Sequence, residues 1–382
     1  MNARERVLCA LSHKEPDRIP LDLGAGCSCK FTKYFYVKLL DYFGIKEDIE
    51  MNHIPYQLVN ASDKVLDLLK CDVRSAHLHP VPREKNPYAR SWETEDSYYL
   101  TNNWGVEYRM PKHQGLYYDL IGGVLFDTED DEDDKKFIWP IPEKFPPADR
   151  RELGNYRAAG YATYVSEQFG NGFLQQGPLM WGFENWFAML VAEPERCEPF
   201  IEKLLTKKIE YYDNILEVYG GLVDICCEAD DFGTQRGTFI SPKVIREMIL
   251  PYHKKLNAYL KAKGVGFMTL HSCGSVEAVI PDIIEAGFDC LNPVQISAHN
   301  MSPQHLKKTY GKDIVFWGGG INTQFTLPNG TPEQVREETK RNMDLFARDG
   351  GFVFSTVHNV QDDVPIENFI AMWETFQDNC KY

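Results

Sequence analysis

Short apolar runs alternate with amphipathic segments along most of this chain. From about residue 160 onward, each apolar run precedes a stretch of helical periodicity with its own start and stop signals. Ser241 and Thr331, each followed by proline, begin two such helices, and Gly264 and Gly350 end them. Another helix is expected at about 2–12. The predicted strands are Arg18–Leu23, Asp72–His77, Ala162–Ser166, Val223–Cys227, Phe267–Leu270, Cys290–Val294, Ile314–Trp317 and Phe352–Val357.

Eight strands alternating with helices predict an α/β fold, a (β/α)8 TIM barrel with an N-terminal helical extension. A doubly wound open sheet would give much the same local pattern. Segment 83–140 departs from the alternation, because Tyr-rich pieces such as Ser97–Leu100 and Val106–Arg109 are typical of antiparallel β-hairpins. We therefore expect one barrel domain over 1–382, with 83–140 inserted as a rim or lid.

Composition and charge narrow the classes of ligand. The chain has 382 residues, of which 43% are hydrophobic, and this is ample for a large core. Its 41 basic and 56 acidic side chains give a net charge of -15, which disfavours nucleic acid and anionic membranes as partners. No apolar stretch approaches the roughly 18 residues that span a bilayer. The ten cysteines form no disulfide framework. We expect a cytoplasmic protein whose ligands are small molecules or proteins.

Polar side chains are frequent where the predicted strands end. In a parallel barrel the carboxyl ends of the strands meet at one edge, where barrel enzymes carry their active sites. Bringing many carboxylates, imidazoles and amides together costs desolvation, so a fold that needed only stability would have little reason to do so. The candidate residues at this edge are Asp22, Glu167, Glu228, Asp231, His271, Cys273, Asn292, Gln295, Asn322 and His358.

Three of these residues predict a metal site. His271 and Cys273 end one strand two residues apart, so their side chains point to the same side. His358 follows the last predicted strand and supplies a third ligand. Zinc binds nitrogen and sulfur ligands tetrahedrally, and catalytic zinc sites keep one position open. The alternative is that Cys273 is a small buried hydrophobe and His271 a hydrogen-bonded core histidine.

The remaining candidates suggest acid–base chemistry and substrate binding. Glu228 or Asp231 could act as general acid, although both also fit an acidic cluster at a helix start. Trp181, with Trp186 and Phe183, could form the wall of an aromatic pocket, and core packing explains these rings equally well. The other residues expected to bind substrate are Asp22, Glu167, Asn292, Gln295 and Asn322.

Several segments together resemble the uroporphyrinogen decarboxylase superfamily. The resemblance covers nearly the whole chain apart from 83–140, and it implies a (β/α)8 barrel with an N-terminal helical extension. The segments that carry it are Arg4–His13, Pro16–Pro20, Leu270–Gly274, Asn292–Gln295, Trp317–Asn322, Gly330–Glu333 and Gly350–His358.

This superfamily includes enzymes that decarboxylate the acetate arms of a tetrapyrrole and enzymes that transfer methyl groups to or from a corrinoid protein. The decarboxylases carry an arginine-rich segment near the N-terminus that grips the substrate carboxylates. Here Leu21–Cys27 occupies that region, with no arginine between Arg18 and the next helix. An octa-anionic substrate entering a chain of charge -15 would need such a cluster, so the methyltransferase branch is favoured.

Resemblance to the methyltransferase branch implies a zinc site formed by an HxC motif and a cysteine on the last strand. His271 and Cys273 match the motif, while His358 stands where the coenzyme M enzymes have cysteine. The decarboxylases also have histidine at this position and bind no zinc there. If zinc binds here, the loss of one thiolate makes it a stronger Lewis acid and favours an oxygen over a thiolate substrate.

The resemblance and the residues together predict a corrinoid-dependent methyltransferase. We expect it to demethylate a small methylated compound, by preference a methoxylated aromatic, and to pass the methyl group to the cobalt(I) of a partner corrinoid protein, with zinc polarising the ether oxygen. The alternatives are a decarboxylase with an altered carboxylate grip and a metal-free ligand-binding barrel. A homodimer is left open.

Overall fold

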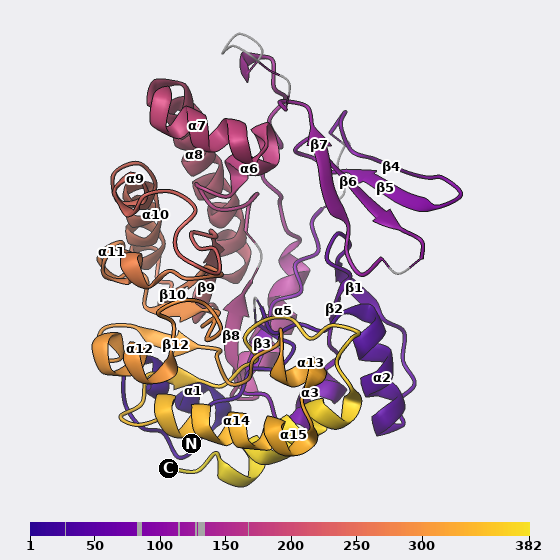
Figure 1. The fold of residues 1–382 in the computed structure, drawn as a ribbon, viewed down its shortest axis with the longest axis vertical. Helices are drawn as coiled ribbons and strands as arrows, with labels where there is room; N and C mark the ends of the chain where they lie inside the picture. Colours follow the sequence, from indigo (N-terminus) through magenta and orange to yellow (C-terminus); the bar gives the residue numbers. More distant parts are fainter. Residues whose placement is uncertain (27, 82–85, 114, 127, 129–133, 167) are drawn as a thin grey trace.

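The computed structural model describes the chain except residues 27, 82–85, 114, 127, 129–133 and 167. Seven parallel strands form one curved sheet in the order β13-β12-β11-β10-β9-β8-β3, so each strand pairs with its neighbours along the chain (Figure 1). They are β3 Val73–Ser75, β8 Ala162–Val165, β9 Ile225–Ala229, β10 Phe267–His271, β11 Cys290–Asn292, β12 Val315–Trp317 and β13 Phe352–Val353.

The segment around Leu21 fills the eighth position of the barrel. Leu21 forms a parallel bridge with Phe354, and Phe354 N donates to Pro20 O over 2.9 Å. On the other side, Asp72 N, next to β3, donates to Leu21 O over 2.8 Å. The predicted barrel is therefore confirmed, but its first strand is reduced to a bridge. The reason is that Leu21 N donates to the Asp72 carboxylate (2.8 Å) instead of to a neighbouring strand.

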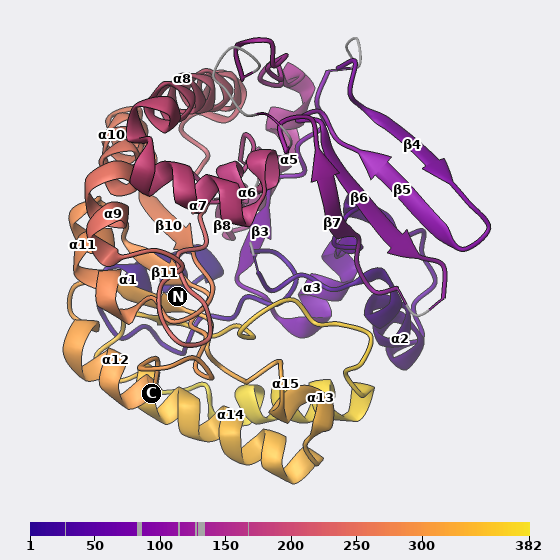
Figure 2. The ribbon, with the colours of Figure 1, turned by 45° about the horizontal axis from the view of Figure 1, so that its top comes forward.

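Helices surround the sheet as an outer layer (Figure 2). The helix predicted after Ser241 begins where expected, since the Ser241 side chain accepts from Val244 N, and Thr331 forms a capping box with Gln334. The helices are α1 Ala3–Leu11, α2 Lys33–Phe43, α3 Asp63–Leu69, α5 Arg150–Ala158, α6 Gln176–Trp181, α7 Phe183–Ala192, α8 Pro194–Tyr219, α9 Pro242–Val244, α10 Leu250–Ala262, α11 Ile280–Glu285, α12 Pro303–Tyr310, α13 Thr326–Asn329, α14 Pro332–Phe346 and α15 Ile366–Asn379, with a π-helical turn at Ile245–Ile249 and 3-10 turns at Pro147–Asp149 and Glu277–Val279.

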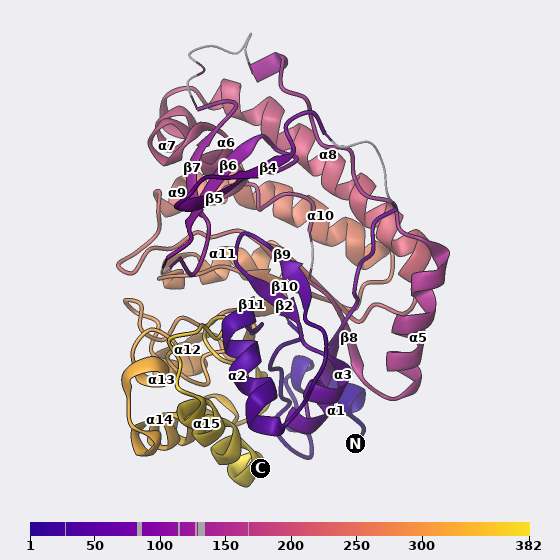
Figure 3. The same cartoon turned by 90° about the vertical axis from the view of Figure 1, so that its right-hand side faces the viewer.

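The antiparallel hairpins expected within 83–140 are present as a second sheet of four strands in the order β4-β5-β6-β7. This sheet stands to one side of the barrel (Figures 2 and 3), and the short hairpin of β1 and β2 lies next to it (Figure 1). Across the described part of the chain, no helix combines the length and apolar character needed to cross a membrane. The strands are β1 Glu50–His53, β2 Leu58–Asn60, β4 Arg90–Glu93, β5 Ser97–Thr101, β6 Val106–Pro111 and β7 Asp119–Gly123.

Candidate metal centre and aromatic cavity

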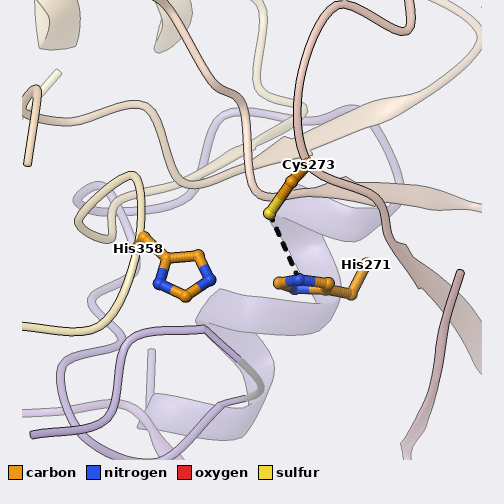
Figure 4. Close-up of side chains that lie close together, drawn as sticks. All are labelled: His271, Cys273 and His358. Carbon is orange, nitrogen blue, oxygen red and sulfur yellow. Dashed lines mark hydrogen bonds between the residues drawn. The ribbon is translucent and has the colours of Figure 1, made fainter. Parts of the chain in front are cut away.

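His271, Cys273 and His358 converge at the carboxyl edge of the barrel, which we call the mouth. His271 ends β10, Cys273 follows two residues later, and His358 lies five residues after β13. One ligand atom from each residue lies within 4.8 Å of the other two. Cys273 Sγ lies 3.5 Å from His271 Nε2, and the two imidazole centroids are 5.8 Å apart (Figure 4). We call these three residues the ligand cluster.

The ligand cluster offers donor types that zinc prefers, and one of its donor pairs has the spacing of a zinc site. Zinc bonds of about 2.3 Å to sulfur and about 2.0 Å to nitrogen, at a tetrahedral angle, place the two donor atoms roughly 3.5 Å apart. The Cys273–His271 distance of 3.5 Å agrees with this value. Burial, together with the neighbouring His271, lowers the pKa of His358 to about 4, so its imidazole is neutral at physiological pH. A neutral imidazole is the form that binds metal.

Asn292 sets the tautomer of His271. Its Nδ2 donates to Trp317 O over 3.0 Å, which turns Oδ1 toward His271 Nδ1 at 3.1 Å and toward Ser28 Oγ at 2.8 Å. Because Oδ1 can only accept, the proton of His271 is placed on Nδ1, and the lone pair of Nε2 faces the cluster. Asn292, expected to bind substrate, is therefore a positioning residue in this structure.

Asp231 places a carboxylate beside the ligand cluster. Its Oδ1 accepts from Cys273 N over 2.8 Å and lies 3.9 Å from His271 Nε2. Its Oδ2 accepts from Gln175 Nε2 over 3.1 Å. The side chain is 25% exposed, so it remains open to a ligand in the mouth.

Glu228, the other proposed acid, lies elsewhere. It is fully buried within β9, where it pairs with Lys208 Nζ at 2.8 Å and accepts from the Tyr212 hydroxyl at 2.7 Å. Both partners lie on α8, which packs outside the sheet. A role for Glu228 as acid at the mouth does not fit this position, because its side chain is fully buried and faces α8, whereas the Asp231 side chain is partly exposed.

Asp22 lies inside the barrel rather than at a free surface. Its carboxylate accepts from Trp317 Nε1 and from Gly26 N, each over 3.0 Å. Burial raises the pKa of Asp22. Glu167, the other carboxylate expected to bind substrate, lies outside the described residues.

The two predicted amides at the mouth have local structural contacts. Gln295 Oε1 accepts from Gly274 N over 2.7 Å and so supports the turn that follows Cys273. Asn322 Oδ1 accepts from the backbone of Gln324, over 2.8 Å, and of the next residue. Gln295 is thus close to the ligand cluster, whereas the side-chain hydrogen bonds of Asn322 stabilise its own turn.

Trp181 belongs to the packed core. It is 3% exposed and stacks on Trp186 with a centroid distance of 5.3 Å, while Phe200 packs edge-on against it. Its indole Nε1 donates to Asp134 over 3.0 Å. Phe183, expected beside it, is half exposed and faces Phe187 and Phe239 instead. Of the two interpretations, core packing is the one that the structure supports.

The aromatic wall comes instead from the β1–β2 hairpin and from the inserted sheet. These segments enclose a cavity of about 860 Å3, which we call the aromatic cavity. His53 stacks on Tyr56 with a centroid distance of 4.5 Å. Desolvation, together with the electrostatic effect of Asp231 and Cys273, raises the pKa of Tyr56, so Tyr56 lies within electrostatic range of the ligand cluster. The lining residues are His53, Ile54, Pro55, Tyr56, Ser91, Trp92, Glu93, Tyr98, Tyr99, Leu100, Asn102, Trp104, Tyr108, Tyr118, Gly170 and Asn171.

Sequence reasoning missed these lining residues. The signal that could have found them is the Tyr-rich alternation within 83–140, which indicated hairpins at a rim but was not connected with a binding site. The Tyr-rich composition of the inserted strands was readable from the sequence, whereas the position of the sheet beside the mouth was not.

Fold and site define a (β/α)8 barrel with a candidate metal centre at the carboxyl ends of its strands. More particularly, the chain belongs to the uroporphyrinogen decarboxylase (URO-D) family, whose model matches residues 174–378, more than half of the chain. All three residues of the ligand cluster lie within the matched region.

Two methyltransferases are similar to this chain. A curated relative, the methylated-thiol–coenzyme M methyltransferase of Methanosarcina mazei, is 25% identical over 190 residues, which make up 50% of this chain and 47% of that protein. The chain thus spans about half the length of the curated relative it matches. A solved structure, a methyltransferase from Methanosarcina mazei, superposes with a TM-score of 0.64 over 99% of both chains at 15% identity, which supports the fold.

Proposed function

We propose that this protein is a zinc-dependent methyltransferase that takes a methyl group from a methoxylated aromatic compound and transfers it to the cobalt of a partner corrinoid protein. The observation that carries the proposal is the ligand cluster of two imidazoles and one thiol, with the aromatic cavity within electrostatic range of it at Tyr56. Membership of the URO-D family and similarity to two proteins named as methyltransferases support it.

The aromatic cavity would bind the ring of the methyl donor. Stacked and edge-on aromatic contacts hold a flat ring in a fixed orientation. Of the lining residues, Tyr56 is within electrostatic range of Cys273 and Asp231, so we place the methoxy group of the bound ring on the Tyr56 side of the cavity. Because the ring, and not the methyl group, supplies most of the contact area, the cavity would also retain the demethylated product.

The proposed transfer breaks the bond between methyl carbon and ether oxygen and forms a bond from that carbon to cobalt. Cobalt(I) supplies the electron pair of the new bond and becomes cobalt(III), while the old pair stays on the oxygen, which then takes a proton. Zinc, when held by His271, Cys273 and His358, supplies a Lewis acid that makes this oxygen a better leaving group. Asp231, beside the cluster, is the residue that we assign to deliver the proton.

The types of metal ligand also affect which substrate would be activated. One thiolate and two imidazoles leave more positive charge on a metal than a set with two thiolates. This favours activation of a methyl ether over that of a thiolate, whereas the name of the curated relative refers to methylated thiols. A methylated thiol is therefore the competing donor class.

Metal content is the first test of the proposed function. We expect about one zinc per chain in the untagged protein, and none in Cys273→Ala or His358→Ala, because each variant removes one of only three protein ligands. Cys9→Ala, on α1 and outside the ligand cluster, is the matched control and should keep its zinc. A wild-type protein that stays metal-free after zinc reconstitution would rule out the zinc mechanism.

Methyl transfer is the second test. Zinc-loaded protein with cobalt(I) corrinoid should convert a methoxylated aromatic to its phenol, as measured by mass spectrometry, and Asp231→Asn should slow this conversion by about 100-fold, in the range of a lost general acid. If the protein converts methylated thiols and no methoxylated aromatic, its methyl donor belongs to the methylated thiols. Release of carbon dioxide from a carboxylated compound, without cobalt or zinc, would point to a decarboxylase.

A further inference from the structure

Asp230 and His253 form a buried polar pair next to Asp231. His253 Nε2, on α10, lies 2.8 Å from Asp230 Oδ2, and both side chains are completely buried. The rings of Phe173, Phe232 and Phe288 surround the imidazole, with centroid distances of 4.7, 6.1 and 5.3 Å. No described atom pairs with His253 Nδ1, so we place the proton on Nε2, where the carboxylate accepts it. The proposed methyl transfer uses neither side chain.

Asp230 fixes the backbone that precedes α6. Its two carboxylate oxygens accept from Leu174 N over 3.1 and 3.0 Å, and one of them accepts from Gln175 N over 2.8 Å. Together with His253, these backbone groups suit a carboxylate, which can only accept. A Cβ at Gly172 would lie 2.0 Å from Asp230 Cγ, so this backbone packs directly on Asp230. The position of Gln175 is therefore set by Asp230.

The side chain of Gln175 reaches the proposed acid. Its Nε2 donates to Asp231 Oδ2 over 3.1 Å, while Asp231 Oδ1 accepts from Cys273 N over 2.8 Å. These two contacts, one from each side, fix the plane of the Asp231 carboxylate. Asp230 N also donates to His271 O over 2.8 Å, which holds the same segment against the end of β10. Asp231 is thus connected to the buried pair both along the chain and through Gln175.

We propose that Gln175 is a positioning residue for the acid Asp231, and that the buried Asp230–His253 pair holds Gln175 in place. This inference rests on the proposed function and assigns the residues that orient its proton donor. An acid delivers its proton only within hydrogen-bond reach of the accepting oxygen, and a displacement of about 1 Å can cost about 100-fold in rate. The Asp231 side chain is 25% exposed, so without Gln175 its Oδ2 would be free to turn toward solvent.

Steady-state kinetics of methyl transfer test the role of Gln175. With zinc-loaded protein, cobalt(I) corrinoid and 2-, 3- or 4-methoxyphenol as donor, Gln175→Leu should lower kcat about 10-fold, because leucine cannot donate to Asp231. KM and zinc content should stay as in the wild type. In an Asp231→Asn background the same change should have no further effect, because no acid is left to position. An equal loss of kcat in both backgrounds would overturn the proposal.

The buried pair is tested on α10. His253→Leu should lower kcat about 5-fold, because Asp230 loses a donor and holds Gln175 less firmly. His253→Gln should restore most of this loss, because glutamine Nε2 can take the place of the imidazole Nε2. If His253→Leu does not fold, the comparison of His253→Gln with the wild type and the Gln175→Leu kinetics decide the proposal.

A structural role of His253 alone would give a different result. The matched control is Asn257→Ala, one helical turn further along α10, where a buried amide donates to Ala286 O over 2.9 Å. This variant should melt at a lower temperature than the wild type but keep its kcat. If kcat falls with melting temperature in the same way in Asn257→Ala and His253→Leu, the buried pair only stabilises the fold and the proposal is overturned.

The same measurements separate this inference from the proposed function. A wild type that demethylates no methoxyphenol would reject the proposed function, and the positioning role would fall with it. Methyl transfer that Gln175→Leu leaves unchanged would reject the positioning role alone. Loss of zinc together with activity in Gln175→Leu would mean that Gln175 supports the ligand cluster and not the acid, which would also overturn the proposal.

Discussion

Asn292 shows how one side chain outside the ligand cluster can control it. We expect Asn292→Leu to lower zinc affinity by about 10- to 100-fold, because His271 then loses the acceptor that keeps its proton on Nδ1. Competition with a chromogenic chelator would measure the effect. Ser28→Ala, which removes a donor to the same oxygen but leaves the Asn292 contact with His271, should change the affinity much less. Equal affinities in Asn292→Leu and wild type would contradict this tautomer argument.

For single residues, the sequence predicted the side-chain directions that follow from the two-residue period of a β-strand. His271 and Cys273 are two residues apart at a strand end, so their common direction was readable. Glu228 was misplaced because the strand was expected to end at Cys227, whereas β9 runs from Ile225 to Ala229. Two additional strand residues keep Glu228 within the sheet, facing α8.

The role of Asn292 could not be predicted for a different reason. It depends on the register between β10 and β11, which places Asn292 beside His271. It also depends on the carbonyl of Trp317 on β12, which orients the amide. Contacts that join three strands follow from tertiary structure and not from the local pattern.

Between elements, the pair of Glu228 on β9 and Lys208 on α8 offers a clear test. Lys208→Met alone should reduce the free energy of unfolding by about 3 kcal/mol, because it leaves a buried carboxylate without a countercharge. The double variant Glu228→Leu, Lys208→Met should recover most of this loss. Urea denaturation of the wild type, Lys208→Met, Glu228→Leu and the double variant would give the coupling energy.

The double variant also tests the earlier hypothesis that Glu228 is the acid. If Glu228 only joins β9 to α8, the refolded double variant should keep its methyl transfer activity. Loss of activity with recovered stability would return Glu228 to the list of catalytic residues. For either outcome, the free energy of unfolding and the methyl transfer activity are measured on the same double variant.

Among the elements, the barrel strands were predictable because each is a short apolar run followed by a capped helix. The first strand was predicted over Arg18–Leu23 and is only a bridge, because the Asp72 carboxylate takes the N–H of Leu21. The inserted sheet was predicted as hairpins, but its place beside the mouth follows from contacts between distant segments. Propensity alone cannot give such contacts.

For the whole molecule, the ligand cluster joins β10 to the segment after β13, with β11 and β12 between them. A ligand that binds only the folded chain stabilises it by about 4 kcal/mol at a thousandfold excess over its dissociation constant. We therefore expect zinc to raise the melting temperature of the wild type and a chelator to reverse the rise. Cys273→Ala should show neither change, and an equal rise in this variant would mean that zinc binds elsewhere.

The bridge between Leu21 and Phe354 has a consequence during protein synthesis. Leu21 is translated early, and its pairing partner late, together with His358. At roughly 5–20 residues per second, tens of seconds separate the two ends of this bridge. Until then, a nascent chain can form neither a closed barrel nor the complete ligand cluster. An interrupted translation product would therefore expose open sheet edges and lack a ligand, so quality control could remove it before it captured metal.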